Sequence, residues 1–211
     1  MKKRHKSEVI LDAARSVFFK HGYSAATTDM IQREAGVSKS TVYAYYAGKE
    51  ALFFTVVETE CARFVEKMNG ITFRPGYLRE TLSAFAHAYL SIILSAKGLS
   101  LFRLVVAESA RFPQLLQKFY DSGPLVIVSK VTQYLHEASL EGELALGGLS
   151  EKDAACIFST LVRGEMSLRS LIDAEISPTS QEIDYWAQIA VATFMRAYGK
   201  CKENQDLGSS S

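Results

Sequence analysis

TTDMIQREAGVSKSTVYAYYAGK, residues 27–49, has the pattern of two short helices joined by a tight glycine turn. Thr28 is a suitable N-cap for the first helix, and Gly36 ends it by adopting the left-handed conformation that glycine tolerates. Ser38 is a suitable N-cap for the second helix, Lys39–Tyr46. Two helices linked in this way form a helix-turn-helix.

The apolar residues of this stretch predict which side of the second helix is exposed. Ile31, Val37 and Val42 can bury together with Val17 and Phe18 of the preceding helical segment, which gives a three-helix core. The exposed side then carries small hydroxyls and one cation. A helix of this kind fits into the major groove of DNA, which is about 12 Å wide. The residues at its start and on its outer side are Ser38, Lys39, Ser40, Thr41, Tyr43 and Ala44.

Charge is divided unevenly along the chain. Residues 1–50 contain nine Lys or Arg against five Asp or Glu, whereas the remaining residues contain 15 against 18. A basic segment followed by a mildly acidic one favours contact between the first segment and a polyanion. Within it, Thr28 lies at a helix start whose amides can bind a phosphate, and Lys49 can hold the flanking phosphate. A solvated surface of uneven charge is the alternative interpretation.

The rest of the chain also has helical periodicity. Apolar residues recur at helical spacing in residues 7–21, 49–69, 77–95, 99–110, 124–141, 151–172 and 180–198. Breaks are expected between them, for example at Lys97-Gly98 and at Phe112-Pro113, and Thr179 with Glu182 forms a capping box at the start of the last helix. Sustained two-residue alternation is absent. We expect an all-α fold of eight to ten helices.

Composition restricts the class of protein. The chain has 211 residues, of which 48% are hydrophobic and 22% charged, so it can bury a core and does not have a disordered composition. Its longest uncharged run, residues 81–96, is shorter than the about 20 apolar residues that a bilayer requires. The N-terminal MKKRHKSE has no hydrophobic signal core. We expect a soluble cytoplasmic protein with no membrane partner.

The residue types that commonly serve in catalysis or metal binding are scattered along this sequence. Cys61, Cys156 and Cys201 are isolated, so neither a disulfide framework nor a zinc site is expected, and the first two are interpreted as buried small side chains. The four histidines form no cluster. Sequences of the types GxGxxG, GxSxG and HExxH and a P-loop are absent. We therefore expect neither an enzyme, nor a cofactor, nor a metal site.

Residues 8–56 resemble the DNA-binding domain of the TetR/AcrR family of transcriptional regulators. The resemblance is carried by two stretches that share Thr27: ILDAARSVFFKHGYSAAT, residues 10–27, and TTDMIQREAGVSKSTVYAYYAGKEALF, residues 27–53. It is carried above all by Gly36-Val37-Ser38-Lys39-Ser40-Thr41-Val42-Tyr43. It implies that residues 38–43 and Tyr45 face DNA. It also implies that Tyr43, Thr28 and Lys49 contact the DNA backbone.

Residues 102–124, FRLVVAESARFPQLLQKFYDSGP, are similar to the AefR-like group of C-terminal domains in that family. The resemblance implies a homodimer built from the last two helices and a small-molecule cavity among the middle helices. Wide apolar stripes on residues 151–172 and 180–198 suit such an interface, although they can also fill the core of a single chain. The expected interface residues are Phe158, Leu161, Glu165, Leu168, Trp186, Ile189 and Thr193.

Aromatic and apolar residues of the middle helices are the candidates for the cavity. For each of them, packing in the core is the alternative interpretation. The expected lining residues are Tyr89, Phe102, Val106, Phe112, Tyr120 and Tyr134.

These observations predict a DNA-binding domain at residues 1–50, a helical ligand-binding and dimerisation domain at 51–199 and a disordered tail at 200–211. The function we expect is that of a homodimeric regulator, most simply a repressor, that binds a palindromic double-stranded operator and leaves it when a small, largely apolar effector binds. A helical small-molecule-binding or adaptor module without DNA binding is the alternative.

Overall fold

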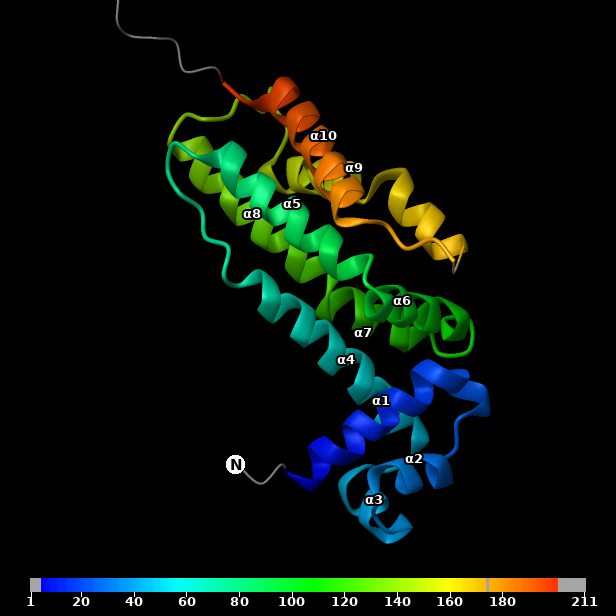
Figure 1. The fold of residues 1–211 in the computed structure, drawn as a ribbon. Helices are drawn as coiled ribbons and strands as arrows, with labels where there is room; N and C mark the ends of the chain where they lie inside the picture. The colour runs from blue at the N-terminus through cyan, green and yellow to red at the C-terminus, as the bar shows by residue number, and fades with distance from the viewer. Residues whose placement is uncertain (1–4, 174, 201–211) are drawn as a thin grey trace, which may run out of the picture. The chain divides into compact units, whose positions relative to one another are not determined.

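The computed structural model describes residues 5–173 and 175–200, and these form ten helices (Figure 1). Within this part of the chain the one β-type contact is an isolated bridge between Leu144 and Gly199, and the all-α prediction is confirmed. The helices are α1 (Lys6–Ala25), α2 (Thr28–Ala35), α3 (Lys39–Tyr45), α4 (Lys49–Met68), α5 (Leu78–Ile93), α6 (Ala96–Glu108), α7 (Pro113–Ser122), α8 (Pro124–Leu140), α9 (Glu151–Ile172) and α10 (Ser180–Tyr198).

Nine of these helices correspond to the predicted segments, and their starts follow local capping chemistry. The capping box of α10 is present, with the Thr179 hydroxyl accepting from the Glu182 amide and the Glu182 carboxylate accepting from the Thr179 amide. The prediction that Lys97-Gly98 separates two helices is wrong. Both residues lie in the first turn of α6, because the Ser95 hydroxyl caps that helix by accepting from the Gly98 amide at 3.1 Å.

Helix α7 is the element that the sequence did not predict. We expected Phe112-Pro113 to separate helices, but Pro113 is the first residue of α7. Proline is well suited to that position, because the amide it lacks would have no partner within the helix. Leu115 and the preceding Phe112 are buried, which anchors the short helix.

The helices form two compact units. Among the described residues, unit 1 contains 5–67 and 95–126, and unit 2 contains 68–94, 127–173 and 175–200. Unit 1 thus extends beyond residue 50 and includes α6 and α7 as well as α1–α4. The predicted functional division after residue 50 stays a prediction, and the predicted tail lies, from residue 201 onward, outside the described residues.

The core of unit 1 joins the helix-turn-helix to the helices behind it. Val42 of α3 and Ile31 of α2 are fully buried together with Phe18 of α1 and Phe53 of α4. The same cluster includes Leu101, Leu104 and Val105 of α6. The short helices are therefore held by a larger core than the three-helix core expected from the sequence.

The two described cysteines differ in environment. Cys61 on α4 is buried as expected, whereas Cys156 on α9 is exposed, which corrects our interpretation of it. Burial, together with the neighbouring Glu60 and Glu58 carboxylates, raises the pKa of Cys61 to about 12. Because the thiolate is the reactive form, Cys61 is a poor nucleophile at pH 8.

In a Cys201→Ser variant, thiol-specific reagent at pH 8 is therefore expected to modify Cys156 quickly and Cys61 only after unfolding. Titration should count one reactive thiol in buffer and two in denaturant. Two thiols that react at similar rates in the folded protein would contradict the buried position of Cys61.

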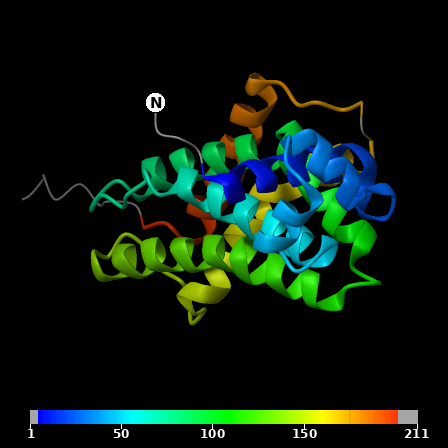
Figure 2. The same ribbon diagram turned by 90° about the horizontal axis from the view of Figure 1, so that it is seen from below.

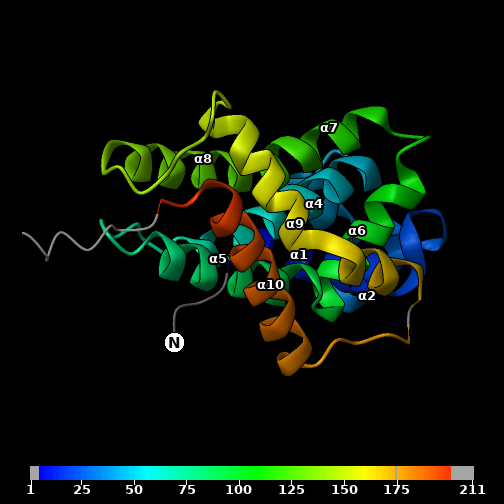
Figure 3. The same cartoon turned by 90° about the horizontal axis from the view of Figure 1, so that it is seen from above.

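Unit 2 is built around α5, α9 and α10, with α10 packed against both of the others (Figure 3). Its core contains a line of aromatic rings in which Phe158 of α9 contacts Phe85 of α5 and Phe194 of α10. Gly164 interrupts the helical conformation of α9 with φ of 45° and ψ of −163°, and the indole of Trp186 lies against it. Gly164 therefore allows α9 and α10 to approach closely within one chain.

No single helix in the described part of the chain is long and apolar enough to cross a membrane. The consecutive helices α5 and α6 reach the required length and apolar composition only when taken together across the break between them.

Candidate nucleic-acid interface

The two short helices of the interface are fixed at their ends by side-chain caps. The cap of α2 is Thr27 and not Thr28 as predicted, because the Thr27 hydroxyl accepts from the Met30 amide at 3.2 Å. Gly36 ends α2 with φ of 65°, a left-handed conformation that allows the chain to turn toward α3. Ser38 caps α3 as predicted, accepting from the Thr41 amide at 3.2 Å.

Helix α3 presents a polar and aromatic face to solvent. Ser40, Tyr43 and Tyr45 are exposed on it, while Val42 points into the core and is fully buried. The hydroxyl of Ser38 lies 2.9 Å from that of Ser40 and 2.8 Å from that of Thr41. This row of hydroxyls and phenols at one helix can donate to or accept from base edges and phosphates.

The cations predicted to contact DNA already have partners in unit 1. Lys39 Nζ lies 3.1 Å from the Asp29 carboxylate of α2, whose hydrogen bond and charge raise the pKa of Lys39. Lys49 Nζ donates to the Ser24 carbonyl at 3.3 Å and lies 4.3 Å from the centre of the Tyr23 ring. Partial burial lowers the pKa of Lys49, and the positive charge of the nearby Arg111 lowers it further.

The structure therefore brings the predicted DNA-facing residues together on α3 and at the starts of α2 and α4. The sequence did not reveal the partners of the two lysines, since Asp29 and Ser24 lie in other helices. Thr28 and Lys49 are half-buried, and the remaining residues lie at or on α3. Their contacts with DNA stay predictions.

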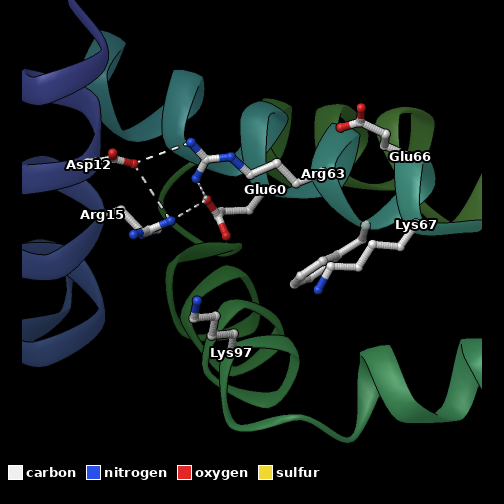
Figure 4. Close-up of a pocket in the computed structure, with 8 residues that line it drawn as sticks. Asp12, Arg15, Glu60, Arg63, Glu66, Lys67 and Lys97 are labelled. Carbon is white, nitrogen blue, oxygen red and sulfur yellow. Dashed lines mark hydrogen bonds and ion pairs between the residues drawn. The ribbon is translucent and has the colours of Figure 1, made fainter. Parts of the chain in front are cut away.

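A charged pocket of about 470 Å³ lies within unit 1, away from the residues of the candidate interface, and the sequence did not indicate it (Figure 4). Glu60 of α4, almost fully buried, accepts from Arg15 of α1 at 3.3 Å and from Arg63 at 2.5 Å. Arg63 also lies 3.3 Å from Asp12 of α1. Burial alone would lower the pKa of Arg63, but the carboxylates of Glu60 and Asp12 outweigh it and raise that pKa. This network ties α1 to α4.

The six residues predicted to line a cavity are distributed over both units. Tyr89 and Tyr134 are buried in unit 2, where both contact the Phe85 ring and where the Tyr134 hydroxyl donates to the Ile71 carbonyl. Phe112 is a core residue of unit 1. The other three, Phe102, Val106 and Tyr120, are exposed in unit 1. Neither unit by itself contains all six residues, and their role in lining a cavity stays a prediction.

The predicted dimer residues all lie on α9 and α10, and most are accessible. Phe158 is the exception, since it is fully buried in the core of unit 2 and has no exposed area to offer a partner. Glu165, Leu168, Ile189 and Thr193 are exposed, and Leu161 and Trp186 are half-buried. Two further apolar side chains that we did not predict, Ile172 and Tyr185, are 78% and 66% exposed on the same helices.

Within the described residues, no group of three or more His, Cys, Asp or Glu side chains is arranged to hold a metal ion.

Comparison with known proteins identifies both parts of the chain. Residues 10–56 match the bacterial regulatory proteins of the tetR family, and residues 80–200 match the C-terminal domain of AefR-like transcriptional repressors. The HTH-type transcriptional regulator UidR of Escherichia coli K12 is 28% identical over 141 residues, which are 64% of this chain and 67% of UidR.

Two solved structures illustrate the likeness of the fold. The flavonoid-responsive regulator FrrA is 32% identical, with a TM-score of 0.78 over 92% of this chain and 97% of its own. The regulator FadR of Bacillus subtilis, in complex with stearoyl-CoA, is 19% identical, with a TM-score of 0.68 over 89% of this chain and 97% of its own. The chain therefore belongs to the TetR family of DNA-binding, non-enzymatic transcriptional regulators, with a C-terminal domain of the AefR-like group.

Proposed function

We propose that the chain acts as a homodimeric repressor that binds a palindromic operator through α3 and is released by a small, largely apolar molecule. The exposed outer face of α3 carries this proposal. The Ser38 cap and the buried Val42 fix α3 itself, and its hydroxyls and phenols are exposed on the side that a major groove can meet.

In the proposed complex each subunit contributes one copy of α3. Base edges would be contacted from Ser38, Lys39, Ser40, Thr41 and Tyr45, and the DNA backbone from Thr28, Tyr43 and Lys49. Lys39 and Lys49 would exchange their present partners, Asp29 and the Ser24 carbonyl, for phosphates or bases. Two half-sites about 34–36 Å apart, or a multiple of this, then suit a two-fold symmetric dimer.

Exposed apolar side chains support the proposed dimer. Leu168 and Ile172 of α9 and Tyr185 and Ile189 of α10 are all exposed in the single chain. Burying such side chains against a second copy removes apolar area from water, which stabilises association. The interface we propose consists of these four residues with Leu161, Glu165, Trp186 and Thr193.

The proposed effector is a molecule with a large apolar part. FrrA responds to flavonoids, and the B. subtilis FadR structure contains stearoyl-CoA; both compounds are of this type. We propose that Tyr89 and Tyr134 contribute to its site, together with Phe102, Val106, Phe112 and Tyr120. The effector would release DNA by binding better to an arrangement of the dimer that does not fit the operator. Because its target is the chromosome, we propose a cytoplasmic location.

The experiment that tests this function is selection of random duplex DNA by the purified full-length chain, with sequencing of the bound fraction. We expect an enriched palindrome, a mass of two chains in solution, and a reporter behind the selected sequence that is transcribed more strongly when the chain is absent. Candidate effectors with large apolar parts are then screened for release of the labelled operator.

Three results would overturn parts of the proposal. No enrichment at low salt from a folded dimer would favour the helical binding module without DNA binding. Reporter transcription that falls when the chain is absent would identify an activator. If the chain is a monomer in solution and binds a single half-site as tightly as the full palindrome, the proposed dimer is contradicted.

A further inference from the structure

A second cation lies beside the predicted phosphate contact Lys49, and it comes from outside the helix-turn-helix. Arg111 lies in the turn between α6 and α7, which belongs to unit 1. Its guanidinium carbon lies 5.3 Å from the centre of the Tyr23 ring, and Lys49 Nζ lies 4.3 Å from the same centre. Because both distances are measured from one point, the two positive groups lie close together.

The position of Arg111 is fixed by the residue that follows it. Phe112 is buried in the core of unit 1 and contacts the Tyr23 ring edge to face, with 4.9 Å between ring centres. The amides of Arg111 and Phe112 both donate to the Glu108 carbonyl, at 3.1 and 2.9 Å, and so close the turn. The end of α1 and the chain that follows α6 therefore lie on the same side of unit 1 (Figures 1 and 2).

The two cations are not neutralised by a carboxylate in direct contact. Arg111 is exposed and lies over the rings of Tyr23 and Phe112, and within the described part of the chain it forms no ion pair. Partial burial and then the charge of Arg111 lower the pKa of Lys49, and the Glu108 carboxylate opposes them without cancelling them. An anion placed beside both cations would therefore favour their charged forms.

Both cations lie at the end of α1, where the chain turns into α2. Lys49 donates to the Ser24 carbonyl there, and Arg111 lies over the ring of Tyr23. Thr28, the other predicted backbone contact next to this turn, is the first residue of α2. Arg111 thus lies beside the part of unit 1 that is predicted to meet phosphates.

We propose that Arg111 binds the operator backbone together with Lys49, at the phosphate that Lys49 holds or at the next one on that strand. A guanidinium suits this role because it presents several N–H donors in a planar fork that matches two phosphate oxygens. The DNA contact would then include a side chain outside residues 10–56, the part that matches the tetR family model. This inference rests on the proposed operator binding.

The test compares the full-length chain with Arg111→Gln, which removes the charge but keeps a long polar side chain. Affinity for the selected duplex is measured at a series of salt concentrations between about 50 and 300 mM. One phosphate contact contributes about 0.9 to the magnitude of the slope of log K against log salt, so losing one from each subunit of a dimer lowers it by about 1.8. We expect a slope lower by about 1 to 2, an affinity about 5- to 50-fold weaker near 0.1 M salt, and an unchanged selected sequence.

Two further variants separate the charge of Arg111 from its packing and from the net charge of the chain. Arg111→Lys keeps a positive charge and should retain most of the wild-type slope. Arg79→Gln removes an exposed arginine of α5 in unit 2, and its slope should equal that of the wild type. Thermal melts of all variants fix a temperature at which each is folded, which we expect to be easily met because Arg111 is exposed.

Several results would overturn the inference. A wild-type slope for Arg111→Gln would mean that Arg111 contacts no phosphate. A slope of Arg111→Lys as low as that of Arg111→Gln would show that packing on the Tyr23 ring, and not the charge, matters. An equal fall in Arg79→Gln would make the effect one of net charge, and a changed selected sequence would contradict a contact with the backbone alone.

Failure of the inference differs from failure of the proposed function. If the wild-type chain selects no DNA sequence, operator binding itself is contradicted. If it selects one and Arg111→Gln binds it with the wild-type slope, only the role of Arg111 is contradicted.

Discussion

Replacing Tyr43 by Ala is expected to weaken operator binding about tenfold to a hundredfold without changing the stability of the protein. Tyr43 is 47% exposed on α3 and lies beside the fully buried Val42 in sequence, so its side chain is directed outward. Its phenol can hydrogen-bond a phosphate, and its ring can pack on the apolar surface of a groove. A hydrogen bond contributes about 0.5 to 1.5 kcal/mol net, so losing one from each subunit of the proposed dimer costs about 1 to 3 kcal/mol, which corresponds to the expected loss.

The measurement is a titration of labelled operator at fixed salt, together with a thermal melt of each protein. Tyr77→Ala is the matched control, because Tyr77 is 48% exposed but lies before α5 in unit 2, where Arg74 stacks on its ring. We expect Tyr77→Ala to bind the operator as the wild type does. Undiminished binding by Tyr43→Ala would mean that the outer face of α3 does not meet the DNA.

The helix-turn-helix could be predicted from the sequence because its signals are local. Gly36 ends α2 and Ser38 starts α3 through contacts that span three or four residues. The misplaced cap of α2 has the same origin: Thr27 and Thr28 are chemically identical candidates, and only the backbone conformation of Thr27 decides between them. Buried Val42 and exposed Tyr43 likewise follow from helical periodicity.

Features that depend on contacts distant in sequence could not be predicted. Glu60 is almost fully buried, and one of the two arginines that pair with it there, Arg15, lies 45 residues earlier in the sequence. Phe158 and Leu168 belong to one apolar stripe of α9, yet the first is fully buried and the second is 52% exposed. Helical periodicity predicts that an apolar stripe exists on α9. Which residues of that stripe become buried depends on where α5 and α10 pack against it.

The short helix α7 shows a third kind of limit. Proline before a helix and proline between helices look alike in a sequence, since both remove an amide donor. Only the burial of Phe112 and Leu115 against the unit 1 core distinguishes them.

Replacing Gly164 by Ala is expected to destabilise unit 2 by about 3 to 5 kcal/mol, combining two separate costs. The backbone of Gly164 has φ of 45° and ψ of −163°, a conformation that residues with a Cβ rarely adopt. In addition, an added Cβ would lie 2.5 Å from the Trp186 Nε1 atom, so the indole would have to move. For a protein of this size the melting temperature should fall by about 6 to 20 °C.

Two controls separate these costs. Gly22 has a similar backbone conformation, with φ of 72° and ψ of 172°, but a Cβ there would meet nothing within 4 Å, so Gly22→Ala should show only the conformational cost of about 1 to 3 kcal/mol. In a Trp186→Leu background, Gly164→Ala should likewise cost less than in the wild type, with a coupling energy of about 1 to 3 kcal/mol in a double-mutant cycle. The chain contains one tryptophan, so the fluorescence of Trp186 reports directly on its displacement in Gly164→Ala. Equal costs in both backgrounds, with unchanged emission, would show that the indole does not restrict this position.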